Sequence, residues 1–244
     1  MSSSFHPTPR TLMGPGPSDV HPRVLGAMAK ATIGHLDPEF IALMEDIKDL
    51  LRYSFRTENK LTLPLSAPGS AAMEASFANL VEAGDKVIVC INGVFGMRMA
   101  ENVRRMNGEL VTVEDDWGTQ VDPEKVEAAL KAHPDAKILA FVHAETSTGV
   151  RSDAKTLCAL AEQYECLSIV DSVTGLAGIE LEVDAWRADV TYSGTQKCLS
   201  APPGISLITF SDKAAAQVKA RNTPVQSWFL DLSLLMAYWE GDGA

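Results

Sequence analysis

The chain has 244 residues, of which 46% are hydrophobic, so it is long enough to bury one large core. Its formal net charge of −11 argues against nucleic acids and anionic membranes as partners, because neither would be attracted to an acidic surface. The composition favours small molecules or other proteins as partners.

The cysteines and the apolar runs indicate in which cellular compartment the protein is found. The four cysteines show no C-x-x-C spacing, which favours reduced thiols in an intracellular protein and predicts no metal site. No apolar run has the length of a membrane span, and residues 1–17 lack the hydrophobic core of a signal peptide. We therefore expect a soluble, cytoplasmic protein.

The first part of the chain divides into an arm and a helical region. Residues 1–20 are rich in proline and glycine, which predicts an extended N-terminal arm. From His21 to Arg56 apolar residues recur at steps of three and four. This period predicts two helices, joined at residues 34–38.

After Arg56, short runs rich in β-branched residues alternate with helix-like segments. Seven strands are predicted, at residues 61–66, 87–92, 109–114, 138–143, 166–171, 190–193 and 205–210. The early runs are almost continuously apolar, as is typical of strands that helices cover on both faces. The pattern predicts a three-layer α/β/α fold around a mostly parallel seven-stranded sheet.

The end of this pattern departs from the regular alternation. The connection from Ser193 to Ile205 is too short and too rich in proline for a crossover helix, so we expect the last strand to run antiparallel to its neighbour. Two further helices are predicted, at residues 212–221 and 228–239.

Ligands of such sheets bind where the carboxyl ends of the strands gather, and several of these ends carry distinctive residues. After the first strand, Gly69 and Ser70 open a helix whose free N–H groups could hold a phosphate. Ordinary N-capping by Ser70 is the simpler alternative. After the second strand, Phe95 either lies against a planar ring or packs under the following helix.

The later strand ends carry polar groups. The segment H-A-E-T-S-T-G at residues 143–149 gathers hydroxyls and a carboxylate, which indicates either a site or a capped turn, and we interpret His143 as structural. Asp171 closes a buried strand, where an acid needs a cation or hydrogen-bond donors. Lys197 follows the next strand, so the acid and the amine are expected to face one pocket.

Together these strand ends fit pyridoxal phosphate, although Lys197 alone would be interpreted as a solvated surface residue. The lysine would form the Schiff base, Asp171 would keep the pyridine nitrogen protonated, and the helix end would hold the phosphate. The combination is more specific than any one of its members.

The same segments resemble the class V pyridoxal-phosphate-dependent aminotransferases, above all the alanine-glyoxylate and serine-glyoxylate enzymes. The motifs that carry the resemblance are G-P-G-P-S at 14–18, S-A-P-G-S at 66–70, N-G-V-F-G at 92–96, H-A-E-T-S-T-G at 143–149, V-D-S-V-T at 170–174 and Y-S-G-T-Q-K-C-L-S-A-P-P-G at 192–204. The resemblance runs from about Leu12 to the end, and the lysine motif is its most specific part.

The resemblance implies a role for each matching residue. Lys197 and Asp171 would be the catalytic pair, and both would bind the cofactor. The other cofactor-binding residues would be Pro68, Gly69, Ser70 and Gln196 around the phosphate, Thr146 at the ring hydroxyl, and Phe95 and Val173 on the two ring faces. Pro15 and Gly16 would lie near the substrate.

The resemblance also implies an activity and a partner. The expected reaction is transamination between a small amino acid, alanine or serine, and glyoxylate or a similar 2-oxo acid, in a homodimer. Residues 21–244 would form the large cofactor-binding domain. Family members continue past a point like Gly241 into a smaller domain, which supplies an arginine for the substrate carboxylate. None of that domain is present in this sequence, so the resemblance predicts a truncated enzyme. Neither Arg151 nor Arg221 lies in the arginine's motif, so neither is assigned its role.

Two alternatives remain open at this stage. One is a truncated paralogue that binds pyridoxal phosphate without turnover. The other is a related lyase or cysteine desulfurase, for which Cys198 should point away from the Lys197 amine if the backbone is extended there. A peroxisomal location also stays open, since a C-terminal signal would be lost with the tail.

Overall fold

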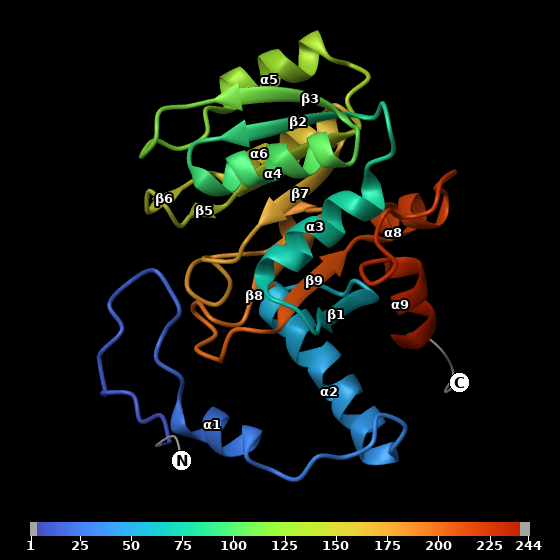
Figure 1. Cartoon of the computed structure of the whole chain (residues 1–244). Helices are drawn as coiled ribbons and strands as arrows, with labels where there is room; N and C mark the ends of the chain where they lie inside the picture. Colours follow the sequence, from blue (N-terminus) through green and yellow to red (C-terminus); the bar gives the residue numbers. More distant parts are fainter. Residues whose placement is uncertain (1–3, 240–244) are drawn as a thin grey trace.

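The computed structural model describes residues 4–239 and is built around a single large sheet (Figure 1). In spatial order its strands are β1 (Leu61–Leu65), β9 (Ser206–Phe210), β8 (Val190–Gly194), β7 (Leu167–Asp171), β4 (Ile138–Val142), β2 (Lys86–Ile91) and β3 (Glu109–Glu114). Neighbours from β8 to β3 pair in parallel, whereas β9 runs antiparallel to both β8 and β1. The mostly parallel seven-stranded sheet and its antiparallel last strand are therefore confirmed.

Helices cover both faces of this sheet, as the apolar strands predict. One face packs against α3 (Gly69–Leu80), α4 (Val94–Arg105), α8 (Asp212–Lys219) and α9 (Leu232–Trp239). The other packs against α2 (Pro38–Phe55), α5 (Pro123–Ala132), α6 (Ala154–Gln163) and α7 (Val183–Trp186). Side chains alternate along each strand. Ala140 therefore packs into the core between the sheet and the first group of helices, and Phe141 packs into the core on the opposite face. The three-layer fold is confirmed.

The N-terminal region contains an arm and two helices, and the connection between the helices, residues 29–37, is longer than the predicted 34–38. Residues 4–20 form an irregular arm, α1 (Pro22–Met28) follows, and α2 begins after Asp37, whose side chain accepts a hydrogen bond from the Glu39 N–H. Pro38 at the first helical position fits this start, because its missing N–H would have had no partner there. Residues 1–3 lie outside the described part of the chain.

The structure corrects one helix and adds three short elements. The last helix, α9, begins at Leu232 rather than 228, because the Asp231 carboxylate accepts the Ser233 N–H and stops the helix there. β5 (Ala144–Glu145), β6 (Val150–Arg151) and α7 are too short to leave a period in the sequence. None of the helices within residues 4–239 is both long and apolar enough to span a membrane.

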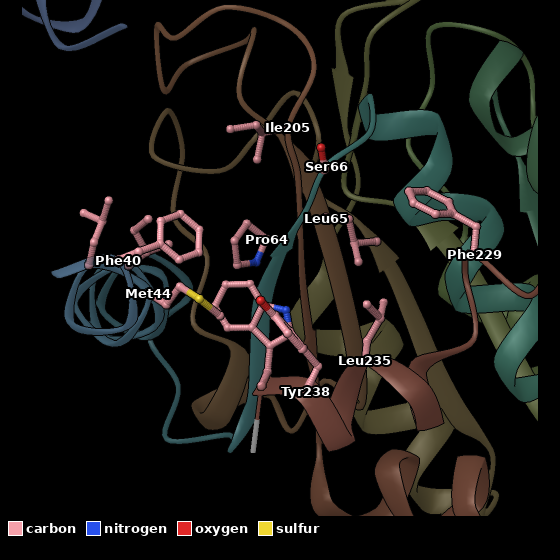
Figure 2. A pocket seen from close by; sticks show the side chains of 12 residues that line it. Phe40, Met44, Pro64, Leu65, Ser66, Ile205, Phe229, Leu235 and Tyr238 are labelled. Carbon is pink, nitrogen blue, oxygen red and sulfur yellow. The ribbon is translucent and has the colours of Figure 1, made fainter. Parts of the chain in front are cut away.

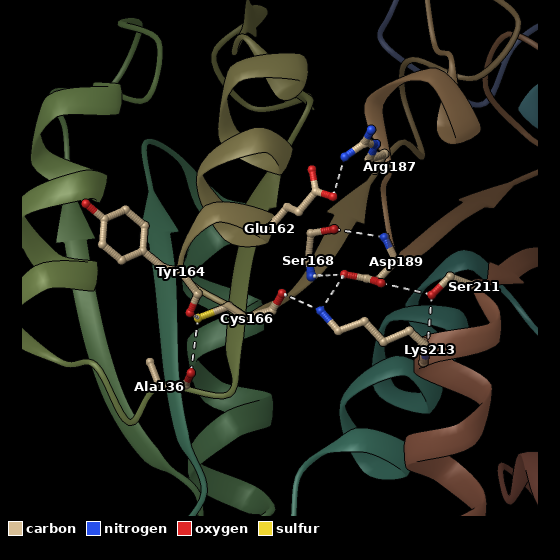
Figure 3. Close-up of polar contacts among 10 residues, drawn as sticks. Ala136, Glu162, Tyr164, Cys166, Ser168, Arg187, Asp189, Ser211 and Lys213 are labelled. Carbon is tan, nitrogen blue, oxygen red and sulfur yellow. Dashed lines mark hydrogen bonds and ion pairs between the residues drawn. The ribbon is translucent and has the colours of Figure 1, made fainter.

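A buried acid holds the starts of β7 and β8 together (Figure 3). Asp189 accepts the Ser168 N–H at 3.0 Å and the Ser211 hydroxyl at 2.9 Å, and its own N–H donates to Ser168 Oγ at 2.9 Å. Lys213 lies 4.0 Å from the same carboxylate. This network at the amino ends fixes the register of two strands whose carboxyl ends carry the candidate site.

Candidate active site

The predicted site residues gather at the carboxyl edge of the sheet, on the connections that follow five of its strands. A Cβ atom placed on Gly69, after β1, would meet Gly194 Cα and a Val173 methyl, each at 3.6 Å. One on Gly93, after β2, would collide with the Glu145 side chain, 2.5 Å from its carboxyl carbon. A hydrogen bond between the Thr146 and Thr174 hydroxyls joins these two groups, so the loops after β1, β2, β4, β7 and β8 form one cluster.

Lys197 lies in a tight turn after β8 and is half-buried. The turn is held by the Thr195 hydroxyl, which donates to the Pro202 carbonyl at 2.6 Å, and by the Ser200 N–H, which donates to the Lys197 carbonyl at 3.0 Å. Burial lowers the pKa of the Lys197 amine, and the charge of Asp171 partly opposes this shift. A larger neutral fraction is what a nucleophilic lysine needs.

The N-terminal arm lies directly against Lys197. The Ser18 N–H donates to the Gln196 carbonyl at 2.9 Å, and the Ser18 hydroxyl donates to the Lys197 carbonyl at 2.6 Å. Gly16 has a φ of +143°, and a Cβ there would lie 2.8 Å from Lys197 Nζ. Only glycine fits this position, while Pro15 beside it is exposed.

Asp171 is buried at the end of β7, and two donors hold its carboxylate. Oδ1 accepts the Val173 N–H and Oδ2 accepts the Tyr192 hydroxyl, both at 2.9 Å. Burial raises the pKa of Asp171 to about 6, although these two hydrogen bonds and Lys197 lower it. The carboxylate is therefore basic enough to hold a protonated nitrogen near neutral pH.

The amino end of α3 is open. Its N-cap is Pro68, and no side chain of residues 4–239 caps the helix, so the alternative in which Ser70 is an ordinary N-cap is wrong. Ser70 lies exposed in the first turn. Beside it, Gln196 Oε1 is buried and has no hydrogen-bond partner among the described residues. The free N–H groups of this helix end suit an anionic group, whereas the Gln196 oxygen is an acceptor that still needs a donor.

Phe95 lies in the first turn of α4 and is partly buried against the core. The guanidinium carbon of Arg98 lies 4.7 Å from the centre of its ring. Phe95 thus packs against the core at the carboxyl edge of β2, which agrees with the packing interpretation, and its contact with a planar ring stays a prediction. Thr146, predicted to contact a ring hydroxyl, shares a short hydrogen bond with the Thr174 hydroxyl.

Glu145 is a site residue to which sequence reasoning assigned no role. It is 1% exposed, and its carboxylate accepts the Phe95 N–H at 3.0 Å, the Ser147 N–H at 3.0 Å and the Ser147 hydroxyl at 2.7 Å. Glu145 thereby satisfies the amino end of α4. The carboxylate in H-A-E-T-S-T-G was the available signal, but its partner on α4 is distant in sequence.

His143 is buried in the core, whereas Cys198 is exposed in the turn after β8. His143 is fully buried with its ring edge against Trp186, and burial lowers its pKa to about 4, with Arg151 adding to the shift and Asp153 opposing it. These features fit the structural interpretation. Cys198 lies in a turn, so the extended backbone assumed for it is wrong; its thiol donates to the Thr174 carbonyl at 3.4 Å.

Neither Arg151 nor Arg221 reaches the cluster. Arg221 donates to the carbonyls of Asn79 and Val81 at 3.1 Å and so caps the carboxyl end of α3. Arg151 lies 3.4 Å from Glu180 in an exposed ion pair. Both side chains are engaged away from the Lys197 amine.

A separate apolar cavity of about 300 Å³ lies between α2, β1 and α9 (Figure 2). Phe40 and Met44 of α2 face Pro64 of β1 and Tyr238 of α9 across it. Among the described residues that line it, the Tyr238 phenol is the only titratable group. The candidate active site is therefore the polar cluster at Lys197 and not this cavity.

Proteins of one family resemble this chain in sequence and in structure. A family model described as Aminotransferase class-V matches residues 13–225. The alanine-glyoxylate aminotransferase of Oryctolagus cuniculus is 42% identical over 234 residues, which cover 96% of this chain and 59% of that protein. The (S)-ureidoglycine-glyoxylate transaminase of Bacillus subtilis is 36% identical over 248 residues, covering 94% of this chain and 59% of that protein.

A solved structure agrees with these sequence matches. The crystal structure of alanine-glyoxylate aminotransferase from Nostoc sp. has a TM-score of 0.97 and 42% sequence identity to this chain. The match covers 100% of this chain and 64% of the Nostoc chain. The chain thus spans less than two thirds of the length of these relatives.

Proposed function

The chain belongs to the class V aminotransferase family, and from this premise we propose that it binds pyridoxal phosphate through Lys197 and catalyses transamination. The observation that carries the proposal is the cluster in which a half-buried lysine, a buried acid and an uncapped helix end meet at one edge of the sheet. Each of these groups suits a different part of that cofactor.

The chain offers a group for every part of pyridoxal phosphate. The Lys197 amine would bind the aldehyde, and Asp171 would bind the pyridine nitrogen. Pro68, Gly69, Ser70 and Gln196 would surround the phosphate, with Thr146 at the ring hydroxyl and Phe95 and Val173 on the ring faces. The uncapped amino end of α3, with its free N–H donors, is the feature that supports an added anion.

Bound in this way, pyridoxal phosphate would withdraw electrons from the α-carbon of an amino acid. The protein supplies the proton transfers. The lysine amine, once displaced by the substrate amine, would take the α-proton as a neutral general base, and burial favours that neutral form. Asp171 would hold a proton at the ring nitrogen, while Gly16 and Pro15 on the arm would border the substrate.

We assign the substrates by similarity to relatives that carry glyoxylate in their names. The proposed amino donor is alanine or serine, and the proposed acceptor is glyoxylate or a similar 2-oxo acid. Residues 21–244 would be the cofactor-binding domain and residues 1–20 its arm. A homodimer is supported by exposed apolar side chains on α1 and α2, including Met28, Leu50 and Tyr53.

One observation favours a second function, cofactor binding without turnover. Arg151 and Arg221 are both engaged elsewhere, and a guanidinium is the group best suited to a substrate carboxylate. A protein with the Lys197 cluster alone would hold pyridoxal phosphate but bind amino acids weakly.

A transamination assay on the 244-residue chain separates the two functions. With pyridoxal phosphate, alanine and glyoxylate, we expect glycine to form in wild type and not in Lys197→Ala. The matched control is Lys213→Ala, which removes a lysine at the opposite edge of the sheet and should keep activity. Cofactor binding without glycine formation would establish the second function instead.

A further inference from the structure

We propose that Tyr192 is a positioning residue for Asp171, because its hydroxyl fixes the carboxylate that is to receive the ring nitrogen. This inference rests on the proposed function. Asp171 and Tyr192 are directly paired across β7 and β8, and the phenol oxygen lies 2.9 Å from Asp171 Oδ2. The strand register, rather than a flexible loop, therefore sets the hydrogen bond.

The Tyr192 hydroxyl is a polar group in otherwise apolar surroundings. The residue is fully buried, and its ring belongs to the core beneath α3. A phenylalanine would fill that space equally well, so packing alone does not call for an oxygen there. Burial and the neighbouring Asp171 charge raise the pKa of the phenol well above its ordinary value, so it stays a hydrogen-bond donor.

The charges around Asp171 explain why a donor is needed. Glu145, at the end of β5, is a second buried carboxylate and raises the pKa of Asp171, whereas Lys197 in the turn after β8 lowers it. The Val173 N–H holds only one carboxylate oxygen. Without the phenol, the acid would keep its proton to higher pH and would accept a ring N–H less well.

The direct test is Tyr192→Phe, with Tyr164→Phe as the matched control, since Tyr164 donates to Glu127 at the surface side of α5 and α6. In the cofactor-free protein, carbon-13 titration of the Asp171 carboxyl should show a pKa raised by about one to two units in Tyr192→Phe and unchanged in Tyr164→Phe. An unchanged Asp171 titration in both variants overturns the proposal.

A second readout uses the cofactor and an analogue with carbon in place of the ring nitrogen. Tyr192→Phe should weaken pyridoxal phosphate binding about tenfold and leave the affinity for the analogue unchanged. Equal weakening of both ligands would mean a packing role and would overturn the proposal. If wild type binds neither ligand, the proposed function fails while the titration still tests the Tyr192 contact.

A third variant covers the case in which Tyr192→Phe does not fold. Uniform replacement of tyrosine by 3-fluorotyrosine keeps the ring size and makes the phenol a stronger donor. The pKa of Asp171 should then fall below its wild-type value. A rise or no change in that titration would contradict the role of the hydroxyl.

Discussion

Burial of the Asp171 carboxylate lowers the stability of the cofactor-free fold at neutral pH. Its folded pKa of about 6 lies above the ordinary value of 3.8, so its contribution to stability is fully present below the unfolded pKa and is lost as pH rises through 6. By pH 8 the buried charge costs about 3 kcal/mol in the cofactor-free protein. A group held at such a cost is expected at a functional site.

A prediction follows from the loss of stability that ionised Asp171 causes as the pH rises. In the cofactor-free protein, Asp171→Asn should be more stable than wild type at pH 8 by about 2–3 kcal/mol, and the difference should vanish near pH 4. Urea unfolding across this range measures it, with the exposed Asp46→Asn as control. A stability difference that does not change with pH would contradict the burial of an ionised Asp171.

Sequence reasoning at this scale identified single residues better than their contacts. The positions of Lys197 and Asp171 could be predicted because Asp171 closes one recognisable strand and Lys197 comes shortly after the next. The Tyr192 hydroxyl and the Glu145 carboxylate could not, because their partners depend on strand register and on a loop that returns to α4. Ser70 was offered as a cap, but the chain enters α3 one residue before it.

At the scale of elements, the arm and α4 depend on tight approaches. Gly16→Ala should lift the arm from the Lys197 turn, because the added methyl meets the lysine side chain and the φ of +143° disfavours alanine. We expect an amine reagent to modify Lys197 several-fold faster in this variant, as followed by peptide mass spectrometry. Gly14→Ala, which has no described atom within 4 Å of the added methyl, should leave the rate unchanged; equal rates in both variants would show that the arm does not cover the lysine.

The start of α4 depends on Glu145. Glu145→Ala leaves the Phe95 and Ser147 N–H groups without their acceptor, which should cost about 2–4 kcal/mol of unfolding free energy. Glu101→Ala on the same helix breaks only exposed pairs with Arg104 and Arg105 and should cost less than about 1 kcal/mol. Chemical unfolding of the two variants tests this order, and similar losses would refute the capping role.

The elements themselves were predictable where a pattern had room to repeat. Each of the seven strands was found with its ends shifted by no more than one residue. The two-residue strands β5 and β6 and the single turn of α7 are too short for any period. The start of α9 was missed because apolar residues at 228–230 extend the helical pattern beyond the Asp231 cap.

At the scale of the molecule, apolar strands predicted the layers but not the order of the sheet. The parallel run from β8 to β3 follows from strands that alternate with helices. The place of β1 at the far edge, paired antiparallel to β9, was not predicted, because pairing between distant strands leaves no mark in either one. That placement nevertheless brings the open end of α3 beside the Lys197 turn.

The most direct measurement of the central claim is where pyridoxal phosphate becomes attached. The purified chain should be mixed with the cofactor, reduced with borohydride and mapped by peptide mass spectrometry, alongside Lys197→Arg and Lys213→Arg. The account predicts one reduced adduct, on Lys197, which is lost in Lys197→Arg and kept in Lys213→Arg. No adduct, or label spread over surface lysines in all three proteins, would contradict it.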